Sequence, residues 1–348
     1  MIGPRVLVTG VGGRSVGHQI LQALLLLGDQ YSVVATDADA FSYGLYQVKD
    51  RYVVPIATDA RYLEAIRGLV QRERIDVLLP GTEPEVAALA SCNGELGCAL
   101  IVNPRPVLEI CANKNRLANW LSTNGFLSPR TVQSTEWKAL VDQTGFPVVA
   151  KPAENTGGSK GVQVLNSAEE IGQYLALSAA PERALFQQYV GSGSDEYTVG
   201  VAISEHGEVI DSIVLRRVLM GLSLGLTRQI GGRSYSLSTG YSQGIIIKHP
   251  RIQQVCEDLA VRIGARGPLN IQCRCVGDDV YVFEVHPRFS GTTSIRAAAG
   301  FNEPDMLIRN HVFHESIQRQ NYQTDVAAIR AFSHLLVPLT DLAGTPRA

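Results

Sequence analysis

Two neighbouring stretches, Asn270-Ile-Gln-Cys-Arg-Cys-Val276 and Val280-Tyr-Val-Phe-Glu-Val-His-Pro-Arg288, decide the fold prediction for this chain. Both are rich in β-branched and aromatic residues, and Gly277-Asp-Asp279 between them is a turn sequence, so they predict a β-hairpin. A three-residue loop sets three facing pairs: Val276 with Val280, Gln272 with Glu284, and Asn270 with His286. Facing Cβ atoms lie about 4.5–5.5 Å apart, and the period of two puts the polar pairs on one face.

The polar face of this hairpin has the chemistry of a cation site. It combines a carboxylate and an imidazole with two amides, from Glu284, His286, Asn270 and Gln272. The carboxylate and amide oxygens among these groups suit Mg²⁺, which often bridges to substrate phosphates. Arg288 leaves the same hairpin and could steady a transferring phosphate. A solvated polar face is the alternative, and a register shift of one residue would separate the facing pairs.

A strand that ends in lysine and a glycine-rich loop lie earlier in the chain. Residues 146–151 predict a buried strand ending at Lys151, and 154–161 form a Gly/Ser loop with a second lysine, Lys160. Such a loop can bring several backbone N–H groups and an ammonium group to phosphate oxygens. The spacing is not that of a Walker A loop, and a plain hairpin loop is the alternative.

The first hundred residues alternate strands and helices, which predicts a parallel, doubly wound sheet. The expected strands are 5–9, 31–36 and 76–79, and the expected helices are 16–27, 59–72 and 83–91. The glycine turn Gly10-Val-Gly-Gly13 and the acids Asp37 and Asp39 resemble a dinucleotide site. However, Ser15 stands where that fingerprint needs its third glycine, so a tight strand-to-helix turn is the favoured interpretation.

The pattern of expected helices and strands changes after residues 103–104. The expected elements are a helix over 113–124, a linker at 128–129, a helix capped by Ser134 or Thr135, a helix begun by a Ser167–Glu170 capping box, and a strand over 185–190. From Glu196 onward the strands alternate in the antiparallel manner. Segment 219–242 is rich in Gly, Ser and Arg, and it predicts a substrate-facing loop without regular structure.

Composition excludes several classes of protein. The chain has 348 residues, enough for two or three domains. Its 31 Lys and Arg against 33 Asp and Glu give a net charge of −2, so nucleic acid is not an expected partner. The longest apolar runs are far short of the ~20 residues of a membrane span, and no signal peptide is expected before the first strand. The six cysteines form no CxxC pair, so free thiols and a cytoplasmic location are expected.

In their order along the chain, these motifs resemble the ATP-grasp superfamily. The resemblance rests on Lys151, the Gly/Ser loop, a hinge strand with a later acid, and the Gln…Glu-x-x-Pro-Arg hairpin, and the closest likeness is to carbamoyl-phosphate-synthase-like carboxylate–amine ligases. It implies an α/β fold that begins with a Rossmann-like parallel sheet, the pre-ATP-grasp domain, over 1–112. A central lid subdomain over 113–190, a C-terminal subdomain with an antiparallel sheet over 191–316, and an extension over 317–348 would follow. Since the pre-ATP-grasp domain normally binds no dinucleotide, the first glycine turn becomes a scaffold.

The resemblance also implies a role for each motif residue, with ATP and Mg²⁺ as cofactors and Mn²⁺ as an alternative metal. The implied nucleotide contacts are Lys114, Lys151, the loop residues Gly157, Gly158, Ser159 and Gly161, the hinge residues Gln187, Gln188, Tyr189 and Val190, and Glu196 at the ribose. The implied metal positions are Gln272, Glu284 and His286. The expected catalytic residues are Arg288, Lys160 and Arg217.

Two departures from the family pattern bear on this prediction. The hinge has Gln187-Gln188 where a glutamate is common, which is tolerable because adenine is read there through backbone groups. His286 stands where the family usually has Asn, and imidazole suits Mn²⁺ or Zn²⁺ better than Mg²⁺. Either the second metal position is altered, or His286 only forms a hydrogen bond to phosphate.

The expected reaction joins a small carboxylate, such as an amino acid, to an amine through an acyl phosphate, with release of ADP and phosphate. Four arginines could hold a carboxylate through bidentate contacts, although a solvated arginine is the favoured alternative for any one of them: Arg216, Arg217, Arg228 and Arg233. Glu83 could reach an amine, but an acid that merely favours a helix start is the favoured interpretation. Other ATP-grasp chemistry, such as carboxylation or carboxylate phosphorylation, and a regulatory nucleotide-binding protein are the rival hypotheses. A homodimer is the default assembly.

Overall fold

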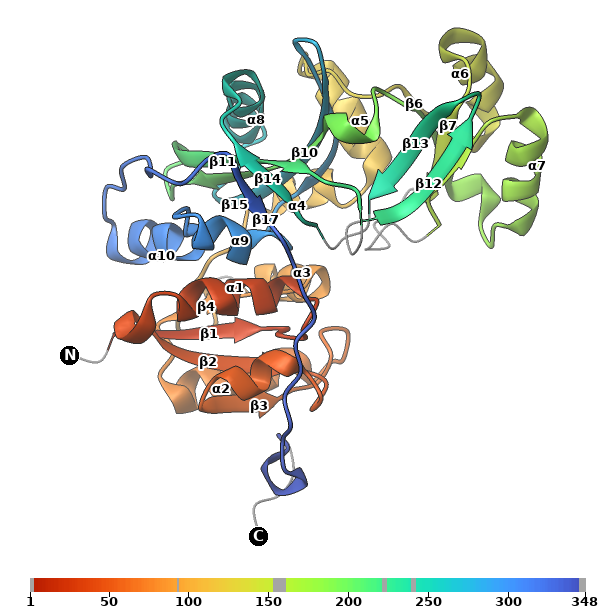
Figure 1. Cartoon of the computed structure of the whole chain (residues 1–348). Helices are drawn as coiled ribbons and strands as arrows, with labels where there is room; N and C mark the ends of the chain where they lie inside the picture. The colour runs from red at the N-terminus through yellow and green to blue at the C-terminus, as the bar shows by residue number, and fades with distance from the viewer. Residues whose placement is uncertain (1–2, 93, 153–160, 221–223, 239–241, 344–348) are drawn as a thin grey trace.

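In the part of the chain that the structure describes, the strands form three sheets and one separate two-stranded hairpin (Figure 1). The structure is a computed structural model, and it describes residues 3–92, 94–152, 161–220, 224–238 and 242–343. No helix within those residues has both the length and the apolar character of a membrane span. All six cysteines are free thiols, as their spacing predicts.

The N-terminal sheet is parallel, which confirms the predicted fold class for this part of the chain. Its strand order is β3-β2-β1-β4-β5. Successive residues of the first strand alternate between two cores, because Val6 and Val8 pack in the cluster of α1 and Leu7 packs in the cluster of α2. The elements are β1 (Arg5–Thr9), α1 (Val16–Leu25), β2 (Ser32–Asp37), β3 (Asp50–Val53), α2 (Tyr62–Glu73), β4 (Val77–Leu79), α3 (Glu83–Ala90) and β5 (Ala99–Leu100).

The small sheet is antiparallel with strand order β6-β9-β7-β8, and two helices, α4 (Arg105–Cys111) and α5 (Lys114–Thr123), lead into it. Its elements are β6 (Thr131–Gln133), α6 (Trp137–Thr144), β7 (Val148–Pro152), β8 (Gln163–Leu165), α7 (Ala168–Leu177) and β9 (Ala184–Gln188). The predicted cap of α6 is wrong: a short 3₁₀ turn over Ser134–Glu136 precedes the helix, and its N-cap Glu136 makes no side-chain cap bond.

The predicted capping box of α7 forms only in part. The Glu170 backbone N–H donates to Ser167 Oγ at 3.2 Å, as expected. The Glu170 carboxylate instead accepts from the Asn166 backbone N–H at 2.8 Å and forms an ion pair with Arg228. The tertiary partner therefore replaces the local reciprocal bond.

The large sheet is antiparallel with strand order β16-β15-β10-β11-β14-β17, which confirms the antiparallel pattern predicted after Glu196. Its strands are β10 (Glu196–Ile203), β11 (Val209–Arg217), β14 (Gly244–Ile247), β15 (Gly267–Val276), β16 (Asp279–His286) and β17 (Val326–Ala328). The accompanying helices are α8 (Pro250–Arg262), α9 (Thr293–Ala298) and α10 (Glu303–Phe313).

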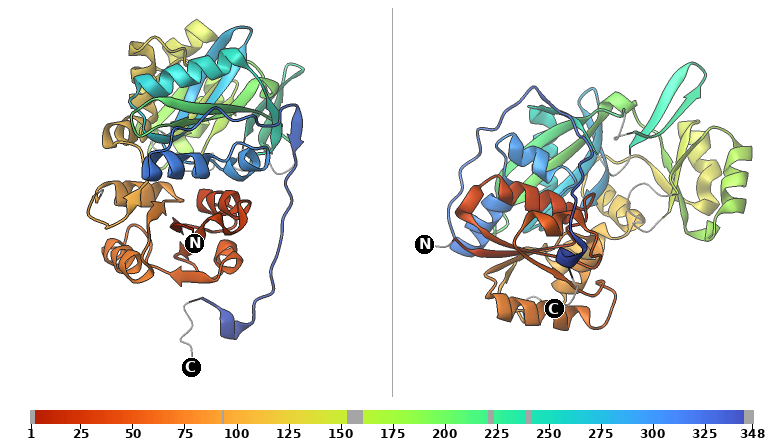
Figure 2. Two further views of the ribbon diagram at one scale, coloured as in Figure 1. Left: turned by 90° about the vertical axis from the view of Figure 1, so that its left-hand side faces the viewer. Right: turned by 60° about the horizontal axis from the view of Figure 1, so that its bottom comes forward.

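The prediction of an irregular loop over 219–242 is wrong. Strands β12 (Leu224–Ile230) and β13 (Arg233–Ser238) pair into an antiparallel hairpin that turns at Gly231-Gly232, both with positive φ. Its described side chains from 226 onward are exposed or half-buried. The alternation that signals a strand is present but short, with Leu224 and Leu226 in one strand and Tyr235 and Leu237 in the other, among Gly, Ser and Arg residues that suggest a loop. Figure 2 shows this hairpin extending beside the small sheet.

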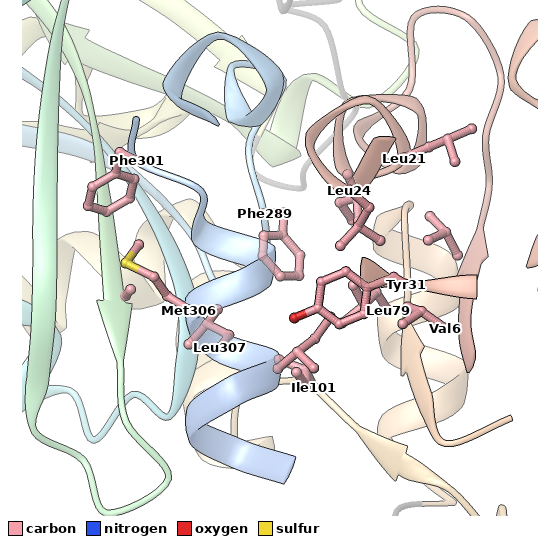
Figure 3. Close-up of a cluster of buried hydrophobic side chains, with 14 of the residues drawn as sticks. Val6, Leu21, Leu24, Tyr31, Leu79, Ile101, Phe289, Phe301, Met306 and Leu307 are labelled. Atoms are coloured by element: carbon pink, nitrogen blue, oxygen red, sulfur yellow. The ribbon is translucent and has the colours of Figure 1, made fainter. Parts of the chain in front are cut away.

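One hydrophobic cluster joins the N-terminal sheet to the rest of the chain (Figure 3). Tyr31 and Leu79 lie there beside Phe289 and Leu307, and the Tyr31 hydroxyl donates to the Asp305 carboxylate at 2.7 Å. This packing holds the carboxyl ends of β1 and β4 against the segment that follows β16. After β17 the chain runs extended along the side of the N-terminal sheet (Figures 1 and 2).

Candidate active site

A cavity of about 700 Å³ lies where the three sheets meet, and it collects most of the predicted site residues. Those that line it are Lys114, Lys151, Gln187, Gln188, Tyr189, Val190, Glu196, Arg217, Gln272, Glu284, His286 and Arg288. Four predicted residues, Gly157, Gly158, Ser159 and Lys160, lie outside the described residues. Gly161 lies instead on the wall of another cavity, beside β8 and α7, where its carbonyl accepts from the Tyr174 hydroxyl at 3.0 Å.

The polar hairpin faces this cavity with the predicted pairs in place. Gln272 lies opposite Glu284, and Asn270 lies opposite His286. The predicted loop is wrong, however, because Val276 pairs with Asp279 across a two-residue turn. A bulge between Gln272 and Cys273 takes up the extra residue, Phe283, and restores the expected register beyond it.

Glu284 is a half-buried carboxylate on the wall of the cavity. Burial opposes its ionisation, but the charges of His286, Lys114 and Lys151 outweigh that effect and lower the pKa of Glu284 to about 2. The pKa of Lys151 falls to about 8 because burial outweighs the attraction of Glu284. The pKa of Lys114 is lowered as well, mainly by burial. Two cationic groups therefore stand beside one ionised carboxylate, which suits a ligand carrying several phosphates.

The hinge positions Lys151 through a side chain. Lys151 lies near the end of β7, and its Nζ donates to Gln187 Oε1 on the neighbouring strand β9 at 2.9 Å. The Gln187 amide in turn donates to Thr131 Oγ1 at 2.7 Å. The glutamine found where a glutamate is common thus orients the lysine without adding a negative charge.

Buried arginines surround Glu196 at the position predicted for the ribose. Arg217 Nη1 lies 3.2 Å from Glu196 Oε1, and it also donates to Gln272 Oε1 at 3.2 Å. Arg217 is therefore a buried link between Glu196, the residue predicted to bind ribose, and Gln272, a predicted metal ligand. The other arginines of the segment lie elsewhere: Arg228 binds Glu170 and the Val164 carbonyl, and Arg216 and Arg233 are exposed.

Glu83 also lines the cavity, at the first position of α3 just beyond the carboxyl end of β4. Glu83 Oε1 accepts from Arg288 Nη2 at 2.7 Å and lies 3.1 Å from His286 Nδ1. Burial opposes ionisation of Glu83, but His286 and Arg288 together hold its pKa well below the usual range. Glu83 is thus more than a helix-start acid. Its place after a parallel strand was the available sequence signal.

Sequence reasoning missed further residues of this cavity. They include Arg274, which contacts Glu196, together with Arg14, Ser15, Thr198, Phe283 and Ser290. Asn270 has a structural partner rather than an open oxygen, since its Oδ1 accepts from Thr198 Oγ1 at 2.8 Å and from Arg296 Nη2 at 2.7 Å. These residues belong to no recognisable sequence motif. Their place in the cavity becomes evident only from the residues that contact them in the folded chain.

The residues fit a hard cation that is bound together with phosphate oxygens. Within the described residues no group of three or more His, Cys, Asp or Glu side chains forms a ready metal cage. Mg²⁺ needs no such cage, because it is commonly held by one or two carboxylates and substrate phosphates. Glu284 supplies an ionised carboxylate, and Gln272 lies directly opposite it. His286 has carboxylates on both sides, with Nε2 3.4 Å from Glu284 and Nδ1 3.1 Å from Glu83.

Comparison with known families agrees with this geometry. Residues 193–333 match the family described as "ATP-grasp in the biosynthetic pathway with Ter operon", and residues 6–101 match "PylC-like, N-terminal domain". Residues 6–101 are therefore similar to a PylC-like N-terminal domain, and residues 193–333 are similar to an ATP-grasp domain. The resemblance that the motifs indicate is confirmed.

The individual proteins that resemble this chain have low sequence identity to it. The carbamoyl phosphate synthase large chain of Helicobacter pylori is 24% identical over 249 residues, covering 68% of this chain and 22% of the relative. Two solved structures share the fold. The biotin carboxylase domain of the Hydrogenobacter thermophilus 2-oxoglutarate carboxylase has a TM-score of 0.66 at 16% identity, covering 94% of this chain and 73% of its own. The L-amino acid ligase of Bacillus licheniformis has a TM-score of 0.63 at 18% identity, covering 90% and 75%.

Proposed function

We propose that this protein is an ATP-dependent carboxylate–amine ligase that forms an amide or peptide bond between small molecules, with amino acids as the first candidates. The observation that carries the proposal is the arrangement of side chains around the cavity of about 700 Å³. A hinge, Glu196 and two lysines line one part of it, the ionised Glu284 lies beside those lysines, and Arg288 is paired with Glu83 in another part. This layout offers separate places for a nucleotide and for a second, acidic substrate.

In this proposal the residues act by positioning and by neutralising charge. Backbone groups of the hinge bind adenine, and Lys114 and Lys151 bind the phosphates. A substrate carboxylate oxygen attacks the γ-phosphorus, and the bond from that phosphorus to the bridging oxygen breaks, giving an acyl phosphate and ADP. Arg288 neutralises the transferring phosphoryl group. The amine nitrogen then attacks the acyl carbon, phosphate leaves, and the nitrogen loses a proton.

Mg²⁺ would be held by Glu284 and Gln272 with His286 beside them, and it would neutralise the phosphate oxygens. Lys160 and the loop around it would cover the phosphates. The division into four segments at 112, 190 and 316 and a homodimeric assembly also remain proposals. The solved neighbours support this class of chemistry, since one is named an L-amino acid ligase and another was crystallised with MgADP and bicarbonate as a carboxylase domain dimer.

The test is phosphate release from Mg·ATP in the presence of amino acids, supplied singly and in pairs. Glu284→Gln serves as the inactive variant, and Glu95→Gln, an exposed carboxylate elsewhere, serves as the matched control. Release that requires two amino acids would support the ligase. Release with one acid alone, trapped as a hydroxamate by hydroxylamine, would support an acyl phosphate with another amine.

Two other outcomes would change the proposal. Release that requires bicarbonate and no amine would replace the ligase by a carboxylase. Binding of ATP with no release in any combination would favour a regulatory nucleotide-binding protein.

A further inference from the structure

A second cavity, of about 780 Å³, lies between the N-terminal sheet and the extended C-terminal segment 326–333. The glycine turn and first turns of α1 form one wall, and α9 with the C-terminal segment forms the other. None of the residues that line it in the described part of the chain is an aspartate or a glutamate. Two guanidinium groups, those of Arg14 and Arg330, line it.

The amide groups on the wall are arranged to donate hydrogen bonds. Gln47 Oε1 lies 2.9 Å from His18 Nε2 and accepts from Gln22 Nε2 at 2.9 Å. Gln19 Oε1 accepts from the Ser294 hydroxyl. Because these oxygens are already engaged, the NH₂ groups of Gln19 and Gln47 are the part of each amide left for a ligand. Amide donors together with guanidinium groups suit an anion.

His18 contributes no added positive charge to this cavity, and exposed apolar side chains lie beside it. Burial, with a further contribution from the Arg330 charge, keeps the pKa of His18 below its usual value despite its bond to Gln47. The segment that closes the cavity also exposes apolar side chains, with Ile329 87% and Phe332 73% exposed. A ligand with an apolar part would cover surface that is otherwise in water.

We propose that this cavity binds a small molecule that carries a carboxylate or phosphate group and an apolar part. The anion would lie between Arg14 and Arg330, and the apolar part would contact Phe332. Arg14 also lines the reaction cavity, and Arg330 donates to the carbonyl of Gly291, which lines the reaction cavity as well. The ligand therefore occupies a separate site with a direct structural connection to the reaction site. This proposal does not rest on the proposed reaction.

The experiment measures binding without turnover. Phenyl phosphate and phenylacetate are titrated calorimetrically into the full chain saturated with Mg·ADP, so that the phosphate positions of the reaction cavity are occupied. Benzyl alcohol serves as the neutral probe. Arg330→Gln and Arg14→Gln should each weaken binding about tenfold or more, as expected for the loss of a charge-assisted hydrogen bond. Arg61→Gln, at an exposed arginine paired with Asp59, is the matched control and should bind as the unaltered protein does.

Phe332→Ser gives a second readout, since this exposed side chain can be changed without disturbing a core. It should weaken the binding of both aromatic anions and leave the preference for an anion over benzyl alcohol. Tighter binding of phenyl phosphate would identify a phosphate ligand, and tighter binding of phenylacetate a carboxylate ligand. The proposal is overturned if neither anion binds up to about 10 mM, or if both arginine variants bind as tightly as the control.

Discussion

Arg274 donates from Nη2 to Glu196 Oε2 at 3.0 Å, and its Nη1 donates to the Val190 carbonyl at 2.8 Å. The same guanidinium lies over the Tyr189 ring, 4.4 Å from its centroid. One buried side chain thus holds the hinge and the predicted ribose acid in a common geometry. In the proposed function Arg274 is therefore a positioning residue for the nucleotide.

Replacing Arg274 by Gln should weaken ADP binding roughly tenfold, because the loss of about 1.4 kcal/mol corresponds to one charge-assisted bond. The KM for ATP should rise while kcat changes less, since Arg274 does not reach the reacting phosphate in the proposed arrangement. Arg274→Lys should not restore binding, because an ammonium group cannot make the forked contacts. Equal losses in kcat and in kcat/KM would contradict a positioning role. Arg262→Gln, at an exposed arginine of α8, is the control.

Substitutions of Glu284 and of His286 should differ sharply in their effect on phosphate release from ATP. Glu284→Gln should reduce phosphate release by about a hundredfold or more, because it removes the ionised carboxylate beside Lys114 and Lys151. His286→Asn should keep activity with Mg²⁺ within about tenfold, since both imidazole nitrogens already face carboxylates. Steady-state kinetics of the two variants side by side is the measurement. A loss in His286→Asn as large as that in Glu284→Gln would make His286 a metal ligand.

Gly200 should tolerate no side chain, because a Cβ there would lie 2.2 Å from Nη1 of Arg296, a fully buried residue. Gly200→Ala should lower the free energy of unfolding by about 2–4 kcal/mol through displacement of that guanidinium. Thermal or denaturant unfolding measures the effect. Gly68→Ala is the matched control, since Gly68 lies inside α2 with nothing within 4 Å, and it should be neutral or stabilising. A destabilised Gly68→Ala would show that the effect is not specific to Gly200.

Glu303 should make stability depend on pH. It faces Arg296 at 3.6 Å, yet burial outweighs that attraction and raises the pKa of Glu303 to about 7 from 4.5. The folded chain therefore binds this proton more tightly than the unfolded chain does. The resulting stabilisation is fully present below pH 4.5 and is lost as the pH rises through 7.

The measurement is the free energy of unfolding of the unaltered protein relative to Glu303→Gln across that pH range. The difference should fall by an amount on the order of 3 kcal/mol between the two pKa values. A constant difference would show that Glu303 keeps its charge in the folded state. Glu95→Gln, at an exposed position, should give a flat difference.

The hairpin of β15 and β16 shows which structural details the sequence pattern predicts and which it does not. The pairing of Gln272 with Glu284 was predicted from a three-residue loop, whereas the structure has a two-residue turn and a bulge at Phe283. The two local differences offset each other, so the polar pairs face the cavity as expected. Alternation and turn residues indicate that a hairpin forms, but the position of a bulge depends on what the strand packs against.

Segment 219–242 shows the opposite case. Its strands pair with each other while most of their described side chains stay exposed or half-buried, and their apolar period is short, with Leu224 and Leu226 in one strand and Tyr235 and Leu237 in the other. Their docking depends on contacts far along the chain, such as Arg228 with Glu170 and Arg274 with the Ser236 carbonyl. A pattern confined to one segment contains no information about such partners.

The sequence by itself determined the parallel N-terminal sheet, the antiparallel strands after Glu196 and the polar face of the hairpin, because these depend on local periodicity and turn chemistry. Only the tertiary structure decided that Glu83 meets Arg288, that Arg217 and Arg274 surround Glu196, and that Arg14 and Arg330 line one cavity. These residues are 21 to 316 positions apart in the sequence. Their meeting depends on how the hydrophobic faces of separate sheets pack, which is a property of the whole chain.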